Sequence, residues 1–223
     1  MAHIVRSIVR PSLEQQKMVA EYPPATLHEA QGRQGAIDST IRPIYKGMHL
    51  CGPAVTVSCA PCDNLMLIAA LDVCQPGDVL VVSAGGLAEQ GGFGEILATA
   101  CVAKGIAGLV VDAGVRDGEA INKLGFPVFA KGLAMRGTLK EALGSVNAPI
   151  VLGGLTIEPG DMISGDDDGL VVVRKARIED TCKEARIREN KEADLMRRLR
   201  EGANILELTG LASVLEQKGC VWE

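Results

Sequence analysis

Residues 89–118 read EQGGFGEILATACVAKGIAGLVVDAGVRDG, and we expect this stretch to determine the fold. A glycine-rich loop opens it, and the apolar run Ile96–Lys104 then predicts a buried helix. The next segment, Gly108–Asp112, predicts a buried strand, and a second loop carries Arg116-Asp117. Because residues 79–82 predict another strand before the glycine loop, both loops are expected at one edge of a sheet, where open α/β sheets bind ligands.

Glu95, Arg116 and Asp117 are therefore expected to converge beside a helix start, whose free N–H groups attract anions. Each feature also has a simpler interpretation. The glycines match neither a Walker A motif nor G-x-G-x-x-G, and an isolated Arg-Asp pair is most often a surface salt bridge worth roughly 0–1 kcal/mol. Their combination favours a site, since Mg²⁺ needs only one or two carboxylates and keeps several waters.

The composition limits the class of protein. Of the 223 residues, 47% are hydrophobic and 3% aromatic, which suits a parallel or mixed sheet packed from Val, Leu, Ile and Ala and covered by Ala-rich helices. A net charge of -5 argues against nucleic-acid binding through phosphate contacts. Apolar runs stay well short of the roughly 18 residues of a membrane span, so no membrane association is expected.

The seven cysteines are scattered and odd in number, which predicts free thiols in a reducing cytoplasm. Cys59 and Cys62 form a C-x-x-C between a predicted strand and a predicted helix, where a redox pair would lie. Buried structural thiols are the simpler interpretation. A redox protein using this pair is therefore kept as an alternative.

The remaining elements follow from capping residues and periodicity. We expect helices at 12–20 (capped by Ser12), 26–33, 64–73 (capped by Asp63) and 205–215, strands at 51–59, 127–130 and 150–152, and a hairpin of 155–163 with 169–174 around the acidic turn 164–168. From Ile178 the chain becomes highly charged, and 178–201 predicts a polar helix that is solvated or docks on another subunit. We therefore expect an α/β domain at 1–177 and a C-terminal helical arm at 178–223.

With these residues identified, the chain resembles the 4-hydroxy-4-methyl-2-oxoglutarate / 4-carboxy-4-hydroxy-2-oxoadipate aldolases, which share a fold with the regulator-of-ribonuclease-activity-A family. The matching segments are Asp63-Asn64-Leu65, Leu71-Asp72, Pro76-Gly77-Asp78, Gly91–Glu95, Gly105–Asp117, Pro127–Ala130, Pro159-Gly160-Asp161 and Asp168-Gly169. The glycine-acid loop about twenty residues before Arg-Asp is the most specific of them. The resemblance implies a swivelling-type β/β/α domain and a homotrimer or homohexamer.

The resemblance also implies roles for single residues. Asp117 would bind a divalent metal, Mg²⁺ or Mn²⁺, and Arg116 would stabilise the enolate of pyruvate. The backbone N–H groups of Gly94, Glu95, Ile96 and Leu97 would bind the substrate carboxylate. Glu95 would hold metal-bound water, and Glu192, or the nearby Glu189, would do so from the neighbouring subunit. Asn64 would lie at the pocket wall.

Two activities therefore stand against each other. The first is metal-dependent cleavage of a 4-hydroxy-2-oxo acid to pyruvate plus a second keto acid, with oxaloacetate decarboxylation as a side activity because both reactions form the same enolate. The second is a non-catalytic regulator that binds an RNA-processing enzyme, since the ribonuclease regulators share parts of the motif.

Overall fold

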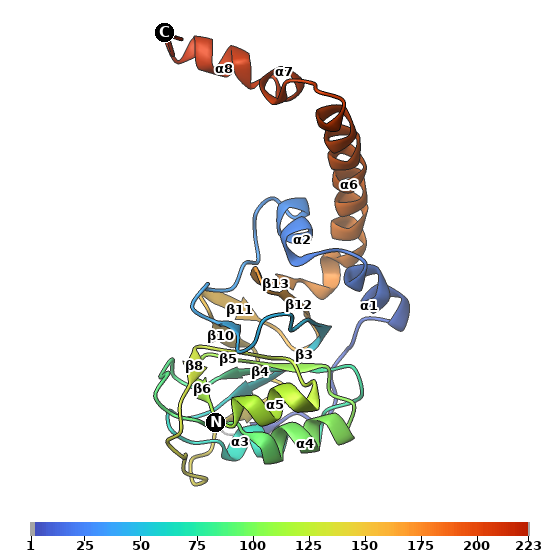
Figure 1. Ribbon diagram of the computed structural model, residues 1–223. Coiled ribbons are helices and arrows are strands. Elements are labelled where there is room, and N and C mark those ends of the chain that lie inside the picture. The colour runs from blue at the N-terminus through green and yellow to red at the C-terminus, as the bar shows by residue number, and fades with distance from the viewer. Residues whose placement is uncertain (1–2, 223) are drawn as a thin grey trace.

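Strand β3 (Leu50–Ser58) joins the two halves of the sheet in the computed structural model, which describes residues 3–222 (Figure 1). Its first residues, Leu50–Pro53, pair antiparallel with β12 (Met162–Asp166). Its second part, Ala54–Ser58, pairs in parallel with β4 (Val79–Ser83). Because one strand serves both partners, the parallel strands and the antiparallel C-terminal strands form one mixed sheet.

The sheet runs in the order β1-β9-β3-β4-β5-β7-β2, and β12 and β13 branch from β3. Strands β3, β4, β5 and β7 are mutually parallel. Strand β2 runs antiparallel to β7, and β9 runs antiparallel to β3 and parallel to β1. The other strands are β1 (His3–Ile4), β2 (Arg42–Pro43), β5 (Gly108–Val111), β6 (Gly114–Val115), β7 (Val128–Ala130), β8 (Gly132–Leu133), β9 (Ser145–Val146), β10 (Ile150–Leu152), β11 (Leu155–Ile157) and β13 (Gly169–Val173).

Helices lie on both outer sides of the β-structure. They are α1 (Leu13–Ala20), α2 (Pro24–Ala30), α3 (Leu65–Ala70), α4 (Glu95–Ala103), α5 (Gly118–Leu124), a 3₁₀ turn at Lys175–Arg177, α6 (Ile178–Arg200), α7 (Ile205–Thr209) and α8 (Leu211–Gln217). Helices α3, α4 and α5 lie on one face of the parallel strands, and the β10–β13 hairpins lie on the other (Figure 1). Outside those hairpins lie α1, α2 and the start of α6.

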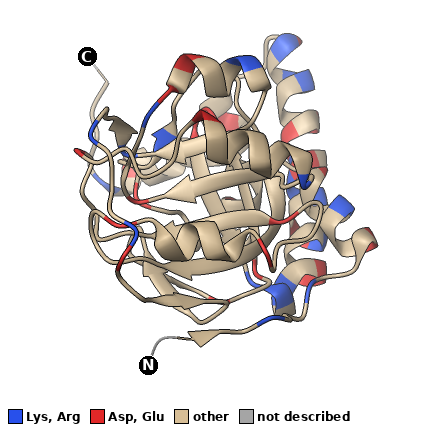
Figure 2. Ribbon diagram, turned by 90° about the horizontal axis from the view of Figure 1, so that it is seen from below, with Lys and Arg blue, Asp and Glu red and all other residues tan. Residues whose placement is uncertain are grey.

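Strand β4 shows why this layering forms. Leu80 and Val82 pack in the hydrophobic cluster beneath α3, α4 and α5, whereas Val79 and Val81 pack in the cluster shared with the hairpins. Successive side chains of a strand point to opposite faces, so an uninterrupted apolar run requires cover on both sides. Figure 2 shows accordingly that charged residues lie on the helices and loops and are nearly absent from the central strands.

The expected α/β class is confirmed, and the sheet is mixed with helices following it at the C-terminal end. The swivelling-type β/β/α description stays a prediction, as does the division of the chain into 1–177 and 178–223. None of the helices in the described part of the chain combines the length and apolarity that crossing a membrane requires.

The predicted ends of the first three helices are partly correct. Ser12 caps α1 through a complete capping box with Gln15, as expected. Helix α2 begins at Pro24 rather than at residue 26, because proline at the first helical position loses no hydrogen bond. Helix α3 ends at Ala70 rather than 73. Asn64 occupies its N-cap position without a side-chain cap, and the Asp63 side chain accepts from the Leu65 N–H, so the expected hydrogen bond from Asp63 to the helix start is present.

The predicted pairing of the C-terminal strands is wrong. Residues 155–163 are not one strand of a hairpin with 169–174. Strand β11 instead pairs with β10, and β12 pairs with β13 over a tight turn at Asp167-Asp168. The polar residues 164–166, expected in the turn, continue β12, because Ser164 pairs with Cys51 of β3 and lies buried. Helix α5, after Asp117, was not expected.

The C-terminal arm begins inside the body and then leaves it. The first two turns of α6 bury Ile178, Cys182 and Ala185 against α1 and α2. The rest of α6 projects away from the sheet, with acidic and basic residues interspersed along it (Figures 1 and 2). The helix expected at 205–215 is two helices, because Gly210 has φ +70° and divides them. Trp222 follows with 73% of its surface exposed.

Candidate active site

The glycine loop before α4 and the loop after β5 lie side by side, as the sequence predicted. Gly91 and Gly114 form a parallel bridge, and the Arg116 N–H donates to the Phe93 carbonyl at 2.8 Å. A β-carbon at residue 94 would lie about 2.5 Å from Asp117 Oδ2, closer than real β-carbon contacts. A side chain at position 94 would therefore push the Asp117 carboxylate away from the start of α4.

Asp117 connects the starts of two helices. Its Oδ2 accepts a hydrogen bond of 3.1 Å from the Glu95 N–H, the first residue of α4, while Asp117 itself precedes α5. Its backbone has φ +56° and ψ +36°, the left-handed region, where only glycine, asparagine and aspartate are accommodated readily. Left-handed residues other than glycine are uncommon and cluster at functional sites.

The charges of Arg116 and Asp117 are accessible. Arg116 Nε lies 3.6 Å from Asp117 Oδ2, and 46% and 44% of the two side chains are exposed. An ion pair this exposed contributes roughly 0–1 kcal/mol to folding. The ion pair therefore stabilises the fold too little to explain the left-handed backbone of Asp117. Both charged groups remain available to a ligand.

A cavity of about 250 Å³ opens beside this pair. It is lined by Asn64, Ile68, Gly91, Gly92, Gly94, Ile96, Leu97, Arg116, Asp117, Gly137, Thr138 and Lys140. The first turn of α4 has no side-chain cap, so the N–H groups of Ile96 and Leu97 have no partner within the helix. The cavity therefore combines a helix start, a guanidinium and a carboxylate, the features that bind an anion next to a cation.

Glu95 begins α4 beside Asp117, as expected, but it does not line the cavity. Its N–H already donates to Asp117, and Glu95 is absent from the cavity lining. Glu95 instead lines a separate, open hollow with Asp117, Glu119 and Lys123. Of the four residues whose amides were expected to bind a carboxylate, Gly94, Ile96 and Leu97 line the cavity.

Glu192 is not near the cavity of its own chain. It lies in α6, where its carboxylate pairs with Arg188 at 2.7 Å. Helix α6 lies on the side of the sheet opposite α4 and α5 (Figure 1), and the same holds for Glu189. A contribution of either residue from a neighbouring subunit stays a prediction.

The donor set suits a sparsely ligated metal. In residues 3–222, no three His, Cys, Asp or Glu side chains are grouped so that they could hold a metal ion. Asp117 offers one carboxylate, of which only Oδ2 is engaged by partners in the described part of the chain. Mg²⁺ keeps several waters and takes one or two carboxylates, so Asp117 fits a mostly hydrated ion of this kind.

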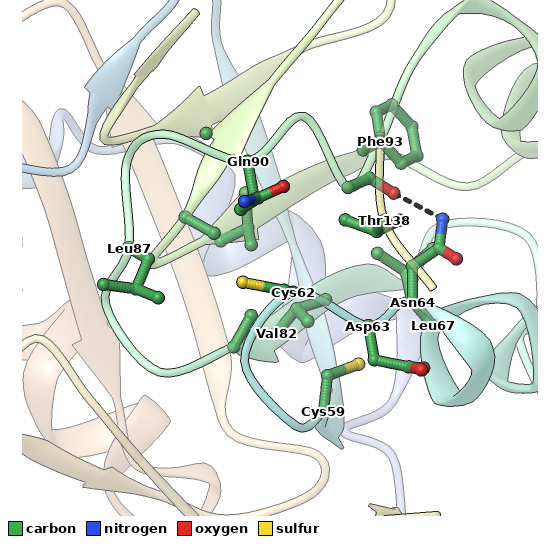
Figure 3. Close-up of a pocket in the computed structure, with 15 residues that line it drawn as sticks. Cys59, Cys62, Asp63, Asn64, Leu67, Val82, Leu87, Gln90, Phe93 and Thr138 are labelled. Carbon is green, nitrogen blue, oxygen red and sulfur yellow. Dashed lines mark hydrogen bonds between the residues drawn. The ribbon is translucent and has the colours of Figure 1, made fainter. Parts of the chain in front are cut away.

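Asn64 lies at the wall of the cavity, as expected. Its Nδ2 donates to the Gly92 carbonyl at 2.7 Å, which ties the start of α3 to the glycine loop (Figure 3). Its Oδ1 is buried and has no hydrogen-bond partner in the described structure. The sequence did not indicate Thr138 and Lys140, because their segment has no periodic pattern and reaches the cavity only through backbone pairing with distant residues.

The C-x-x-C residues line a small apolar pocket behind this wall (Figure 3). All seven cysteines are free thiols. Burial raises the pKa of Cys59 to about 11, which keeps it protonated and unreactive at neutral pH. Cys62 has a left-handed backbone with φ +64°. The raised pKa favours the structural interpretation of Cys59 over a redox role.

Comparisons with known proteins show which family the chain is similar to. The family model described as RraA-like, Aldolase/RraA, matches residues 18–172. A protein of Halalkalibacterium halodurans named "Putative 4-hydroxy-4-methyl-2-oxoglutarate aldolase" is 38% identical over 158 residues, which cover 71% of this chain and 74% of that protein.

Two solved structures share the fold over most of their length. RraAS2 of Streptomyces coelicolor, described as an unusual member of the RNase ES inhibitor RraA protein family, has a TM-score of 0.78 at 30% identity and covers 85% of this chain and 99% of that one. An uncharacterized protein of Pseudomonas syringae pv. tomato has a TM-score of 0.80 at 25% identity and covers 91% of this chain and 100% of that one.

Proposed function

Because this chain belongs to the RraA-like family, we propose that the cavity beside Arg116 and Asp117 is the active site of a divalent-metal-dependent pyruvate aldolase. The substrates would be 4-hydroxy-4-methyl-2-oxoglutarate, cleaved to two pyruvates, or 4-carboxy-4-hydroxy-2-oxoadipate, cleaved to pyruvate and oxaloacetate. The name of the 38% identical relative supports the substrate class. The observation that carries the proposal is the convergence of Arg116, Asp117 and the open start of α4 on one cavity.

The backbone of α4 would orient the substrate. The N–H groups of Ile96 and Leu97 are free to bind the carboxylate next to the 2-oxo group. Asp117 holds the Glu95 N–H, so the first turn of α4 stays in place when the carboxylate binds. The 2-oxo group then lies near Arg116 and Asp117. This arrangement fixes the reacting part of the substrate before bond cleavage.

Arg116 would stabilise the charge that cleavage creates. Loss of the 4-hydroxyl proton lets the C3–C4 bond break, and its electron pair becomes the enolate of pyruvate, which a proton then converts to pyruvate. The Arg116 guanidinium donates to the enolate oxygen as the negative charge develops. A divalent cation bound at Asp117, Mg²⁺ or Mn²⁺, supplies further positive charge at the same place.

Assembly would complete the site. A homotrimer or homohexamer would bring Glu192 of another copy to the metal-bound water, together with Glu95. Arg186 and Arg188 of α6 still pair with Glu21 and Glu29 of their own chain, whereas the ion pairs farther along α6 are formed by Arg197 within the helix and with Glu201 just after it. This outer part of the helix is the surface that a partner copy would contact.

The test is release of pyruvate from either substrate with Mg²⁺ or Mn²⁺, with and without EDTA. We expect turnover that EDTA abolishes and that returned metal restores. Decarboxylation of oxaloacetate should follow the same metal dependence. Absence of both activities in the metal-loaded, correctly folded protein would contradict the proposal.

The second candidate is a non-catalytic regulator of an RNA-processing enzyme. The specific observation in its favour is the similarity to RraAS2, whose description names an RNase inhibitor family. A regulator would release no pyruvate with any metal and would inhibit a purified ribonuclease in a direct assay.

A further inference from the structure

The segment 136–142 forms one wall of the cavity through Gly137, Thr138 and Lys140, and backbone hydrogen bonds hold it in place. The Gly91 N–H donates to the Arg136 carbonyl at 2.8 Å. Leu139 pairs in both directions with the segment before α3, donating to Cys62 at 2.9 Å and accepting from Asn64 at 3.1 Å. The wall therefore joins the glycine loop to the start of α3, although it lies far from both in sequence.

Asp63 fixes the end of this wall from inside the protein. Only 6% of Asp63 is exposed, and its Oδ2 accepts from the N–H groups of Glu141 at 2.7 Å and Ala142 at 3.0 Å. Its Oδ1 accepts from the Leu65 N–H at 2.8 Å. Burial alone would raise its pKa, but the three backbone donors and the nearby Lys140 charge lower the pKa overall, so the group is a carboxylate at neutral pH. A buried charge is thus used to position the two residues after Lys140.

Lys140 is the group that this anchoring presents to the cavity. It is exposed, lines the same cavity as Arg116, and forms no ion pair with a carboxylate in residues 3–222. The charged side chains of the cavity wall are Arg116, Lys140 and Asp117, so cations outnumber anions before any metal binds. Lys140 interacts electrostatically with the buried Asp63 carboxylate but forms no ion pair with it. One 2-oxo carboxylate next to Arg116 would therefore leave the Lys140 ammonium without a carboxylate in direct contact.

We propose that Lys140 is a specificity-determining residue that binds a second carboxylate, carried by the part of the substrate that leaves as the other keto acid, and that Asp63 is its positioning residue. The role of Lys140 in turnover rests on the proposed aldolase function, whereas its role in binding a second carboxylate does not. The ligand class is a 2-oxo acid with a further carboxylate beyond the 2-oxo carboxylate. A long ammonium side chain on a fixed loop suits carboxylates at somewhat different distances.

The experiment compares two ligands that share a head group. Pyruvate and 2-oxoglutarate both present a 2-oxo carboxylate, and only 2-oxoglutarate has a distal one. Calorimetric titration with Mg²⁺ present would be done on the wild type, Lys140→Met, Lys140→Arg and Lys104→Met. Lys104 at the far end of α4 is exposed and outside the cavity, which makes it the matched control.

We expect the wild type, Lys140→Arg and Lys104→Met to prefer 2-oxoglutarate, and Lys140→Met to lose about tenfold of that preference while binding pyruvate as before. For the aldol substrates, the same variant should raise KM more than it lowers kcat. An equal loss for both ligands, or an unchanged preference in Lys140→Met, would overturn the role of Lys140.

Asp63→Asn tests the positioning role. We expect it to lower the preference for 2-oxoglutarate selectively and to add little when combined with Lys140→Met, because both changes act on one interaction. Full additivity in the double variant would overturn the positioning role. If the wild type prefers 2-oxoglutarate through Lys140 but releases no pyruvate from the aldol substrates, the aldolase proposal fails and the binding site stands.

Discussion

The edge of the sheet around Asp117 and the outer part of α6 position their charges in different ways. At the sheet edge, backbone groups from distant segments hold the side chains, as when the Glu95 N–H binds Asp117. In the outer part of α6, side chains pair with close neighbours in the sequence, as Arg197 does with Asp194 and with Glu201. The comparison shows that tertiary contacts fix the first set of charges, whereas the second set is held only relative to its own helix.

The strongest test of the sheet edge is Asp117→Asn. Asparagine tolerates the left-handed backbone and can still accept from the Glu95 N–H, so the fold is retained while the charge is lost. We expect metal-stimulated release of pyruvate to fall at least about a thousandfold, since the carboxylate is the only protein ligand we propose for the metal. Circular dichroism is the control for folding, and appreciable residual turnover would contradict the metal role.

Arg116→Lys should have the next largest effect. Lysine keeps the positive charge but lacks the planar guanidinium group. We therefore expect metal binding to persist, the activation free energy to rise by about 3–4 kcal/mol and kcat to fall accordingly. Metal affinity measured by titration separates the two quantities. Full turnover in this variant would mean that Arg116 does not stabilise the enolate.

Glu192→Gln tests whether the arm reaches another copy. We expect roughly a tenfold loss of turnover, as for groups that orient metal-bound water, without a change in stability. Mixing Glu192→Gln with Asp117→Asn chains after partial unfolding should restore activity to about a quarter of sites, because each shared site draws the two residues from different copies. Absence of restoration would place Glu192 outside the site.

Asp63→Asn makes a prediction about pH. The pKa of Asp63 is lowered in the folded protein, so its stabilising contribution is complete above its unfolded pKa of about 4 and is lost as the pH falls through the lower folded value. We expect Asp63→Asn to lose about 1–3 kcal/mol of unfolding free energy at pH 7. Urea titrations at pH 7 and pH 3 should show this difference shrinking at the lower pH.

The smallest effect is expected at the C-x-x-C. Burial raises the pKa of Cys59 to about 11, so alkylation at pH 8 should be much slower there than at the exposed Cys220. Changing Cys59 to Ala and Cys62 to Gly, which tolerates the left-handed backbone, should leave pyruvate release within about twofold. A disulfide whose reduction switches activity would instead support a redox role.

The sequence predicted those parts of the site that lie within one supersecondary unit. Arg116, Asp117 and the start of α4 follow adjacent parallel strands, so their convergence could be inferred from strand and helix signals alone. The wall that carries Lys140 could not, because it is built by backbone pairing of residues 136–142 with 62–64 and 91, which leaves no local pattern. The hairpins were misassigned for a related reason, since Ser164 is polar yet buried against β3.

The position of Trp222 has a practical consequence. It is the chain's single tryptophan and lies exposed near the end of the arm, far from every hydrophobic cluster of the body. Indole emission will therefore be insensitive to melting of the sheet and sensitive to burial of the last helices. A blue shift of the emission on raising the protein concentration would indicate that these helices are buried against another copy of the chain. Unfolding of the sheet must therefore be followed by a signal other than tryptophan fluorescence.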